Sequence, residues 1–369
     1  MNPLLMCASS SRTGPVEGLI SLAVELRKLG IVAHFAGDTV RPGENLGEHL
    51  ALARVPWETQ LRLSRKVKVS DVLHDARLLA SWVPSRFDVL HAAFAHDHAL
   101  ALWARRKGVL VVRAVQRRID VEPGLFGQRL FALRKSDGVV VHSQAYRTLL
   151  RLHLPEERVA YVPPSVDAVR FSPGGAAGAL RERWGVPRDA PLAGIVARMK
   201  PERGHRQLLR AFAEALRQVP SAWLVLVGRG EDEPALKELA AAIAPGRIVF
   251  GGYARGPDLV DAYRALDVAV WLREGNDGGN RGVLEAMACG IPVLAGSEGA
   301  PGELVRNGID GAVVPPDDEA AIAQALISLL GDLQIARALG RSARARALEF
   351  TPARAAAETL AFWKRLRSL

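Results

Sequence analysis

Residues 268–296 read VAVWLREGNDGGNRGVLEAMACGIPVLAG and contain one complete strand–loop–helix–strand unit. The segments 268–272 and 291–295 are short apolar runs typical of buried parallel strands, and 281–289 between them has helical periodicity. The glycine-rich loop before the helix lets the backbone approach a ligand closely, and the start of the helix supplies unsatisfied N–H groups and a positive dipole end. This unit therefore predicts an anion site, best suited to phosphate.

Apolar runs alternate with amphipathic stretches along the rest of the chain, which is typical of βαβ units around a parallel sheet. The passage SVDAVRFSPGG at 165–175 has no periodicity, and after it the pattern starts again. Two doubly wound α/β domains are therefore expected, at 1–172 and 173–350, followed by a terminal helix at 351–369. The expected strands are 4–8, 31–35, 89–92, 110–115, 139–142, 192–197, 223–227, 248–250, 268–272 and 291–295.

The composition excludes several classes of protein. The chain has 369 residues, 49% hydrophobic and 24% charged, which is typical of globular proteins and enough for two domains. Two cysteines, Cys7 and Cys289, cannot form a disulfide framework or a four-ligand zinc site, so a reducing compartment is expected. No apolar run approaches the ~18 residues that span a bilayer, and the N-terminus lacks the basic region of a signal peptide. A cytoplasmic location is expected.

The charge is distributed unevenly. Residues 1–170 carry 24 Lys and Arg against 16 Asp and Glu, whereas the remainder carries 25 against 23. A basic first half indicates an anionic partner, such as a membrane surface, a lipid phosphate or nucleic acid, or else an arginine-rich surface without a partner. The segment 54–82 interleaves Arg62, Arg65, Lys66 and Lys68 with apolar residues. It is either an interfacial segment on anionic lipid or an amphipathic helix pair packed on the first sheet.

Two acidic residues of the opening stretch are candidates for ligand contact. Glu285 lies about one turn into the helix, where its carboxylate can accept two hydrogen bonds from a vicinal diol such as a ribose. Asp277 lies on the loop and would face another part of the same ligand. The alternative is a glycine-rich connection in which Asp277 caps the helix.

Two arginines follow an earlier strand in a comparable position. Arg198 and Arg203 lie after the strand expected at 192–197 and before the helix expected at 204–216. Two cations at this point suit a leaving nucleoside diphosphate, whose negative charge grows as its bond to the transferred group breaks.

These residues together resemble glycosyltransferase family 4. Asp277-x7-Glu285, followed by Ala-Met-Ala-Cys-Gly-Ile-Pro-Val, is similar to the E-x7-E signature of that family, with Asp in place of the first Glu. The segment 198–205 resembles its R-x4-K-G loop, with Arg203 in place of Lys; arginine still binds phosphate, through a planar fork. The resemblance implies a GT-B fold: two Rossmann-like domains facing a central cleft, with the C-terminal helix, including Phe362 and Trp363, returning to the N-terminal domain.

The resemblance also implies roles for individual residues. Glu285 would bind the ribose and Asp277 the donor sugar, while Arg198 and Arg203 hold the diphosphate; these four form the expected catalytic set. The segment 249–253 resembles the family's base-binding segment, so Tyr253 would stack on the nucleobase. Gly14 would approach the donor phosphate from the first domain. The sugar and distal phosphate would meet the loop residues Gly278, Gly279, Asn280 and Arg281.

One position departs from the family pattern. Many members have a histidine near the transferred sugar where this chain has Gln116, which cannot take up a proton at neutral pH. The departing diphosphate oxygen can instead accept the proton of the acceptor, so orientation and charge stabilisation would dominate catalysis. His91, with His96, Asp97 and His98 after it, is expected on the acceptor side.

We therefore expect a retaining, metal-independent glycosyltransferase without a resident cofactor. It would move a sugar from a nucleoside-diphosphate sugar to a hydroxyl of a glycan, lipid-linked or small-molecule acceptor, in bacterial cell-surface glycan or glycolipid synthesis. An anionic membrane surface is a candidate partner, and the inner face of the cytoplasmic membrane a candidate location. Nucleotide-sugar epimerases and glycosyl phosphorylases of the same fold are alternatives. A non-catalytic nucleic-acid-binding protein is a remote one, because no recognition-helix or stacking motif is present, and an oxidoreductase lacks its G-x-G-x-x-G turn here.

Overall fold

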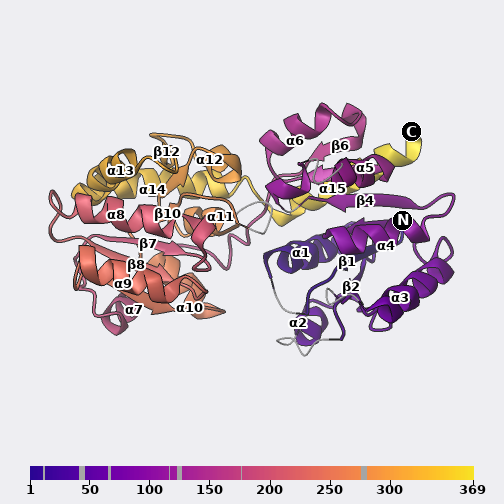
Figure 1. Cartoon of the computed structure of the whole chain (residues 1–369), viewed down its shortest axis with the longest axis horizontal. Helices are drawn as coiled ribbons and strands as arrows, with labels where there is room; N and C mark the ends of the chain where they lie inside the picture. Colours follow the sequence, from indigo (N-terminus) through magenta and orange to yellow (C-terminus); the bar gives the residue numbers. More distant parts are fainter. Residues whose placement is uncertain are drawn as a thin grey trace. The chain divides into compact units, whose positions relative to one another are not determined.

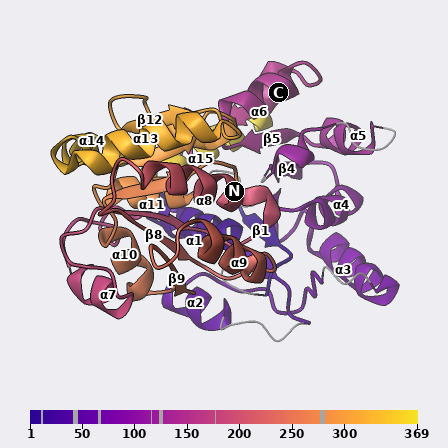
Figure 2. The ribbon, with the colours of Figure 1, turned by 60° about the vertical axis from the view of Figure 1, so that its left-hand side comes forward.

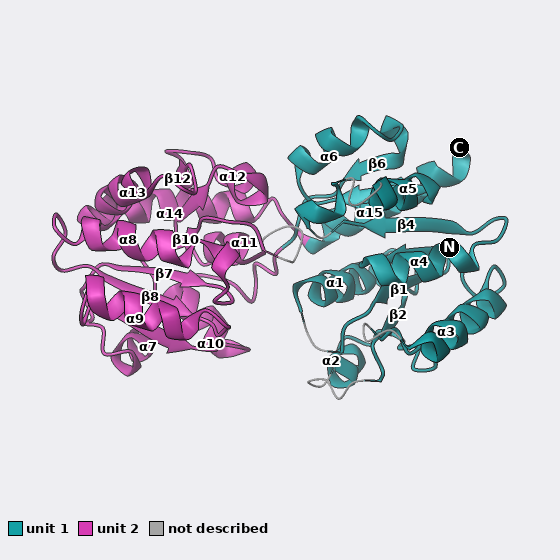
Figure 3. Ribbon diagram, in the orientation of Figure 1, with its two compact units in different colours: residues 1–165, 276–279, 352–369 teal, residues 166–275, 280–351 magenta. Residues whose placement is uncertain are grey.

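The structure is a computed structural model that describes residues 1–10, 13–40, 46–64, 68–115, 117–122, 127–175, 177–275 and 281–369. Within these residues the chain divides into two compact units (Figures 1 and 3). Unit 1 comprises Met1–Ser165 and Pro352–Leu369, so the last helix belongs to the N-terminal unit. Unit 2 comprises Val166–Gly275 and residues 281–351.

Unit 1 is built on a parallel sheet of six strands with the order β2-β1-β3-β4-β5-β6. Its strands are short and almost entirely buried, as expected for a sheet covered on both faces. They are β1 (Pro3–Cys7), β2 (His34–Gly37), β3 (Val89–Ala92), β4 (Leu110–Ala114), β5 (Gly138–Val141) and β6 (Val159–Tyr161). The helices are α1 (Gly14–Lys28), α2 (Leu46–Leu52), α3 (Val69–Trp82), α4 (Ala95–Ala104), α5 (Gln128–Lys135), α6 (Gln144–Arg151) and α15 (Pro352–Ser368).

The helices of unit 1 cover the sheet in two layers. One layer holds α1 and α15, whose apolar side chains share a core with β1, β3 and β4. The other holds α3 and α4, followed by α5 and α6, as Figure 2 shows along the side of the unit. Gly138 allows α15 to pack closely, because a Cβ there would lie within 2.6 Å of the Phe362 ring. The terminal helix thus returns to the first domain, as the fold prediction requires.

Unit 2 repeats this architecture, with the strand order β12-β11-β10-β7-β8-β9. Its strands are β7 (Leu192–Val196), β8 (Trp223–Val227), β9 (Ile248–Gly252), β10 (Val268–Trp271), β11 (Val293–Gly296) and β12 (Gly311–Val314). The helices are α7 (Ala177–Arg183), α8 (His205–Ala215), α9 (Glu233–Ile243), α10 (Pro257–Arg264), α11 (Arg281–Ala288), α12 (Gly299–Leu304), α13 (Glu319–Gly331) and α14 (Leu333–Ala347). One face packs against α8, α9 and α13, and the other against α7, α10, α11 and α14.

Each sheet has one point where the strand order reverses. In unit 1 it lies between β1 and β3, and in unit 2 between β7 and β10. The connections that leave these neighbouring strands go to opposite sides, which opens a crevice at their carboxyl ends where doubly wound domains bind ligands. The two predicted phosphate-binding loops of unit 2 follow β7 and β10.

The boundary between the units lies earlier than the expected 172/173. Unit 2 begins at Val166, whose backbone N–H donates to the Phe350 carbonyl oxygen at 2.9 Å. Phe171 then packs edge-on against Tyr263, with ring centroids 6.0 Å apart. The aperiodic passage therefore belongs to the second unit, because its apolar side chains complete that unit's core.

Some expected strands differ from the observed ones. The strand predicted at 31–35 begins at His34, because the chain first completes a helix stop: Gly30 has φ +78°, and the Ile31 N–H donates to the Leu26 carbonyl oxygen at 3.0 Å. The short edge strands β6 and β12 were not predicted. Each has only a few, partly exposed residues and therefore a weak apolar signal.

The basic segment 54–82 packs on the first sheet. Leu61, Leu63 and Leu79 are completely buried, and Trp82 is nearly so. This packing favours the amphipathic interpretation over the interfacial one, because these apolar side chains face the core. Arg65 and Lys66 lie outside the described residues.

No single helix among the described residues is long and apolar enough to cross a bilayer. Only the helical segments Glu319–Gly331 and Leu333–Ser368 taken together have the length and apolar composition of a membrane span, and a bend of 100° separates them.

Candidate functional site

The central feature of unit 2 is the carboxyl edge of its sheet at β7 and β10. Arg198 lies two residues after the end of β7, and α11, which carries Glu285, follows β10 after the glycine-rich loop. Since β7 and β10 are neighbours at the reversal point, the topology brings the two predicted phosphate-binding segments to one edge.

The arginine loop is held against the end of β10. Gly204 has φ +79°, and a Cβ at this position would lie 3.0 Å from Leu272 Cβ. A side chain here would be strained by both the left-handed backbone and the close approach. Arg203 closes the preceding turn through its backbone N–H, which donates to the Lys200 carbonyl oxygen at 3.1 Å. Helix α8 starts immediately after this turn.

The two predicted cations differ in their surroundings. Arg198 is exposed, and its guanidinium has no hydrogen-bond or ion-pair partner among the described residues. Arg203 is half-buried. Its charge acts on His205, whose pKa falls to about 4 because of burial first and the Arg203 charge second. His205 is therefore neutral near pH 7, and the arginines supply the positive potential.

A third cation at this edge was not predicted. Gly228 and Gly230, after β8, pack so tightly against the backbone of residues 197–199 that a Cβ on either would overlap a carbonyl oxygen. Between them Arg229 is exposed, and its guanidinium lies 4.5 Å from the centre of the Tyr253 ring. Tyr253, expected to stack on a nucleobase, is 53% exposed with one ring face under Arg229. The Gly-Arg-Gly sequence after a strand was the signal for this residue.

Glu285 is half-buried on α11 and is held by a neighbouring helix. The Tyr263 hydroxyl on α10 donates a hydrogen bond of 3.0 Å to Glu285 Oε2. Sequence reasoning missed Tyr263, because its position on a separate helix shows no spacing relation to Glu285. Arg281 begins α11 and is also half-buried.

Part of the predicted donor site lies outside the described residues. These positions are Asp277, Gly278, Gly279, Asn280 and, in unit 1, Gln116. Their roles remain predictions. The expectation that no metal or resident cofactor takes part also stays a prediction.

In unit 1 the edge at the reversal point is held together by a buried carboxylate. Asp97, near the start of α4, accepts hydrogen bonds of 3.1 Å from the backbone N–H groups of Ala8, after β1, and Phe94, after β3. Burial raises the pKa of Asp97, and these hydrogen bonds oppose that rise. Gly14 begins α1 on the other side of the same reversal point. Asp97 therefore has a structural role at this edge.

His91 does not lie where it was expected. Its ring is buried under α15, edge-on to Trp363 with centroids 5.6 Å apart. Burial, followed by the charges of His142 and Arg113, lowers the pKa of His91 to about 3. Because β3 turns this side chain toward the core, the expectation that His91 lines the acceptor side is wrong. His98 is also buried, with Nε2 2.6 Å from Ser136 Oγ.

His96 remains at the edge. It lies in the first turn of α4, is half-buried, and its Nε2 is buried without a hydrogen-bond partner among the described residues. It is the histidine of this segment best placed to meet a ligand at the carboxyl ends of β1 and β3.

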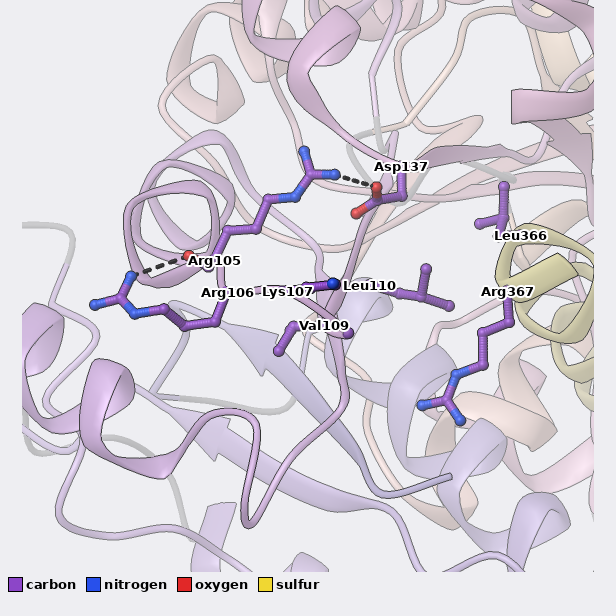
Figure 4. A pocket seen from close by; sticks show the side chains of 9 residues that line it. Arg105, Arg106, Lys107, Val109, Leu110, Asp137, Leu366 and Arg367 are labelled. Carbon is purple, nitrogen blue, oxygen red and sulfur yellow. Dashed lines mark hydrogen bonds and ion pairs between the residues drawn. The ribbon is translucent and has the colours of Figure 1, made fainter. Parts of the chain in front are cut away.

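A hollow of about 750 Å³ lies at the opposite edge of the first sheet, where β4 and β5 begin (Figure 4). Arg105 there pairs with Asp137 at 2.5 Å, and Arg367 pairs with Asp88. The hollow is separate from the edge that carries Gly14 and His96. It is lined by Arg105, Arg106, Lys107, Gly108, Val109, Leu110, Asp137, Leu366 and Arg367.

Comparison with known proteins identifies the class. Over 100% of both chains, the structure superposes on Anabaena HepE in complex with UDP-glucose, with a TM-score of 0.82 and 20% identity. Sucrose-phosphate synthase from Thermosynechococcus elongatus gives a TM-score of 0.81 at 20% identity, again over the whole of both chains. These likenesses, with two doubly wound domains, define a glycosyltransferase-type GT-B fold and confirm the predicted fold class.

The chain belongs to glycosyltransferase family 4. Residues 13–170 match "Glycosyltransferase Family 4" and residues 190–332 match "Glycosyl transferases group 1". A D-inositol 3-phosphate glycosyltransferase of Thermobispora bispora is 30% identical over 300 residues, 74% of this chain and 69% of that protein. These matches confirm the family and the prediction that the protein is a glycosyltransferase.

A second relative is a GDP-mannose-dependent alpha-(1-6)-phosphatidylinositol monomannoside mannosyltransferase of Mycolicibacterium smegmatis. It is 36% identical over 203 residues, 53% of each chain. The chain thus spans about half the length of some curated relatives that it matches.

Proposed function

We propose that this glycosyltransferase transfers a sugar, with retention of configuration, from a nucleoside-diphosphate sugar to a hydroxyl acceptor. The observation that carries the proposal is the edge of unit 2 at β7 and β10. There Arg198, exposed and without a partner in the described part of the chain, and a glutamate held by Tyr263 follow two neighbouring strands. An anion-binding loop beside a diol-binding carboxylate suits a nucleoside diphosphate.

Each group has a separate task in binding the donor. Arg198 and Arg203 would neutralise the diphosphate, and Glu285 would accept hydrogen bonds from the ribose hydroxyls. Arg229 and Tyr253 would form a stacked surface for the base. Asp277 and the N–H groups that follow it would orient the donor sugar.

The chemical step exchanges one bond at the anomeric carbon for another. The bond from that carbon to the diphosphate oxygen breaks, and a bond to the acceptor oxygen forms on the same face. The acceptor proton passes to the departing diphosphate oxygen, so no protein base is required. Arg198 and Arg203 stabilise the charge that develops on the diphosphate, the main contribution expected of the protein.

We infer that the acceptor meets unit 1 at the edge that carries Gly14 and His96. Two relatives act, by their names, on an inositol phosphate and on a phosphatidylinositol mannoside. These relatives favour an acceptor of the bacterial cell-surface glycolipid or glycan class. Two donors are candidates: GDP-mannose, which one relative uses by its name, and UDP-glucose, which is bound in the HepE complex.

A location at the inner face of the cytoplasmic membrane is proposed from the surface of unit 1. Trp103 on α4 and Phe131 on α5 are 57% and 60% exposed. The ends of these helices touch, since Arg105 Nη1 donates to the Lys135 carbonyl oxygen at 2.8 Å. We name this the α4–α5 surface; besides the two aromatic residues it contains Arg105, Arg106, Lys107, Arg129, Arg134 and Lys135. Aromatic rings among cations suit anionic headgroups.

The decisive experiment is a thermal-shift and transfer screen of UDP, GDP and their sugars. A specific donor should raise the melting temperature, and transfer to an added acceptor should release the diphosphate. Glu285→Ala should weaken the binding of both the donor and its free diphosphate about 10- to 100-fold, because hydrogen bonds to a carboxylate are lost. Glu238→Ala, an exposed glutamate on α9, is the matched control and should bind as the wild type does.

If Glu285→Ala binds the free diphosphate as tightly as the wild type does, Glu285 does not contact the ribose. If the protein releases an epimerised nucleotide sugar when no acceptor is present, it is an epimerase and the proposal is wrong. Release of a sugar phosphate from a glycan and inorganic phosphate would replace it with a phosphorylase.

A further inference from the structure

A buried tyrosine lies behind the carboxylate assigned to the ribose. Tyr263 is 1% exposed, and its hydroxyl hydrogen donates to Glu285 Oε2 across 3.0 Å. A carboxylate has about four lone-pair positions, and the Tyr263 hydroxyl takes one of them. The hydroxyl therefore contacts the binding group without occupying the whole of it.

The tyrosine ring is held firmly in place. It stacks on Trp271 with centroids 6.5 Å apart and an angle of 28°, and Phe171 packs edge-on at 6.0 Å. Gly282, three residues before Glu285 and on the same side of α11, makes room for this cluster. A Cβ there would overlap the Trp271 ring and lie 3.0 Å from the Tyr263 hydroxyl oxygen.

The passage that opens unit 2 ties α10 and α11 to a common support. Arg264, next to the tyrosine on α10, donates from Nε to the Ser172 carbonyl oxygen at 2.7 Å. Arg344 donates from Nη1 to the carbonyl oxygens of Phe171 at 2.9 Å and Ala288, at the end of α11, at 2.6 Å. These bonds set the spacing of the two helices, and with it the approach of the hydroxyl to the carboxylate.

We propose that Tyr263 is a positioning residue that presents the Glu285 carboxylate to the ribose diol. The inference rests on the proposed function of Glu285. A glutamate side chain has several rotatable bonds, and ordering it only on binding would cost affinity. The buried hydroxyl removes this cost by fixing one rotamer beforehand.

The test compares the binding of a nucleoside diphosphate that has the ribose diol with the binding of one that lacks it. Calorimetry gives the dissociation constants of UDP and of 2′,3′-dideoxy-UDP, and of the GDP pair, for the wild type, Tyr263→Phe, Glu285→Ala and the double variant. The ratio within each pair reports the diol contact alone. Tyr263→Phe keeps the ring packing, and Tyr146→Phe, at another buried tyrosine in unit 1, is the matched control.

We expect the wild type to favour the ribose form, Tyr263→Phe to reduce the ratio about three- to ten-fold, and Tyr146→Phe to leave it unchanged. The double variant should equal Glu285→Ala, because both substitutions act on one contact. A wild-type ratio in Tyr263→Phe would overturn the inference and leave the proposed function intact. A wild type that does not distinguish the two forms would overturn both, since Glu285 would then not bind the ribose.

Discussion

At the residue scale, some arginines of unit 2 hold the fold, whereas Arg198 faces the ligand edge. Arg344 and Arg181 donate to backbone carbonyl oxygens inside unit 2 and join segments far apart in the sequence. Arg198 follows a strand at the reversal point and has no such partner among the described residues. An exposed guanidinium without a structural bond at this edge is available for an anion.

Substitution of Arg198 tests its assignment to the leaving group. Arg198→Ala should reduce kcat by about 100-fold and raise the donor Kd by less than ten-fold, because the diphosphate charge grows during bond cleavage. Single-turnover kinetics and calorimetry give the two quantities. Arg337→Ala, at an exposed arginine on α14, is the control. If donor affinity and kcat fall by equal factors, Arg198 binds the donor in the ground state and does not specifically stabilise the leaving group.

At the element scale, β3, α4 and α8 each hold a histidine in an environment that excludes its charged form. The pKa is lowered to about 3 for His91 and His98 and to about 4 for His205, in each case mainly by burial. In the unfolded chain a histidine titrates near 6.5. Between these values the unfolded state binds more protons than the folded one. The stability that the folded state gains from keeping these histidines neutral is therefore fully present above about pH 6.5, and it is lost as the pH falls toward 4.

Urea unfolding at pH 7 and pH 5 measures this loss. We expect the free energy of unfolding to fall on acidification, by up to about 2 kcal/mol for each of the three histidines. His91→Leu removes one titrating group from the core beside Trp363 and should make the pH dependence shallower. His153→Leu, an exposed histidine after α6, is the control. A slope in His91→Leu equal to that of the wild type would show that His91 is protonated alike in both states.

At the scale of the whole molecule, six of the 24 cations of residues 1–170 lie on the exposed α4–α5 surface of unit 1. The two segments that form the α4–α5 surface, 103–107 and 128–135, carry six cations and no carboxylate. One of these cations, Arg105, is paired with Asp137, which lies just beyond the second segment. The segment 54–82 carries six further cations against three carboxylates, while its apolar side chains are buried.

Vesicle sedimentation tests this surface. The protein should bind vesicles of phosphatidylcholine with phosphatidylglycerol and not phosphatidylcholine alone, and binding should weaken with salt. Lys107→Glu with Lys135→Glu should lower partitioning at least 25-fold, since each cation near such a surface contributes about five-fold. Arg337→Glu with Arg341→Glu on α14 changes the net charge equally and is the control. If both double variants lose partitioning equally, the net charge of the protein and not the α4–α5 surface determines vesicle binding.

Much of the fold follows from local sequence patterns. The strands at 89–92 and 223–227 were predicted to the residue. The second is a continuous apolar run that ends at Gly228, which is the pattern expected of a buried parallel strand. The edge strands β6 and β12 carry too few apolar residues to show this pattern. The start of β2 was also missed, since it depends on how α1 ends.

The sequence by itself determined the family and the places of Arg198 and Glu285 along the chain, because each motif is a pattern within a single strand–loop–helix unit. It also determined the two-domain α/β architecture, because such units repeat on both sides of the aperiodic passage. Only the tertiary structure decided that His91 faces the core and that Tyr263 bonds Glu285. Both depend on which helix packs against which strand, α15 over β3 and α10 beside α11. Such contacts join residues far apart in the chain, and no local periodicity records them.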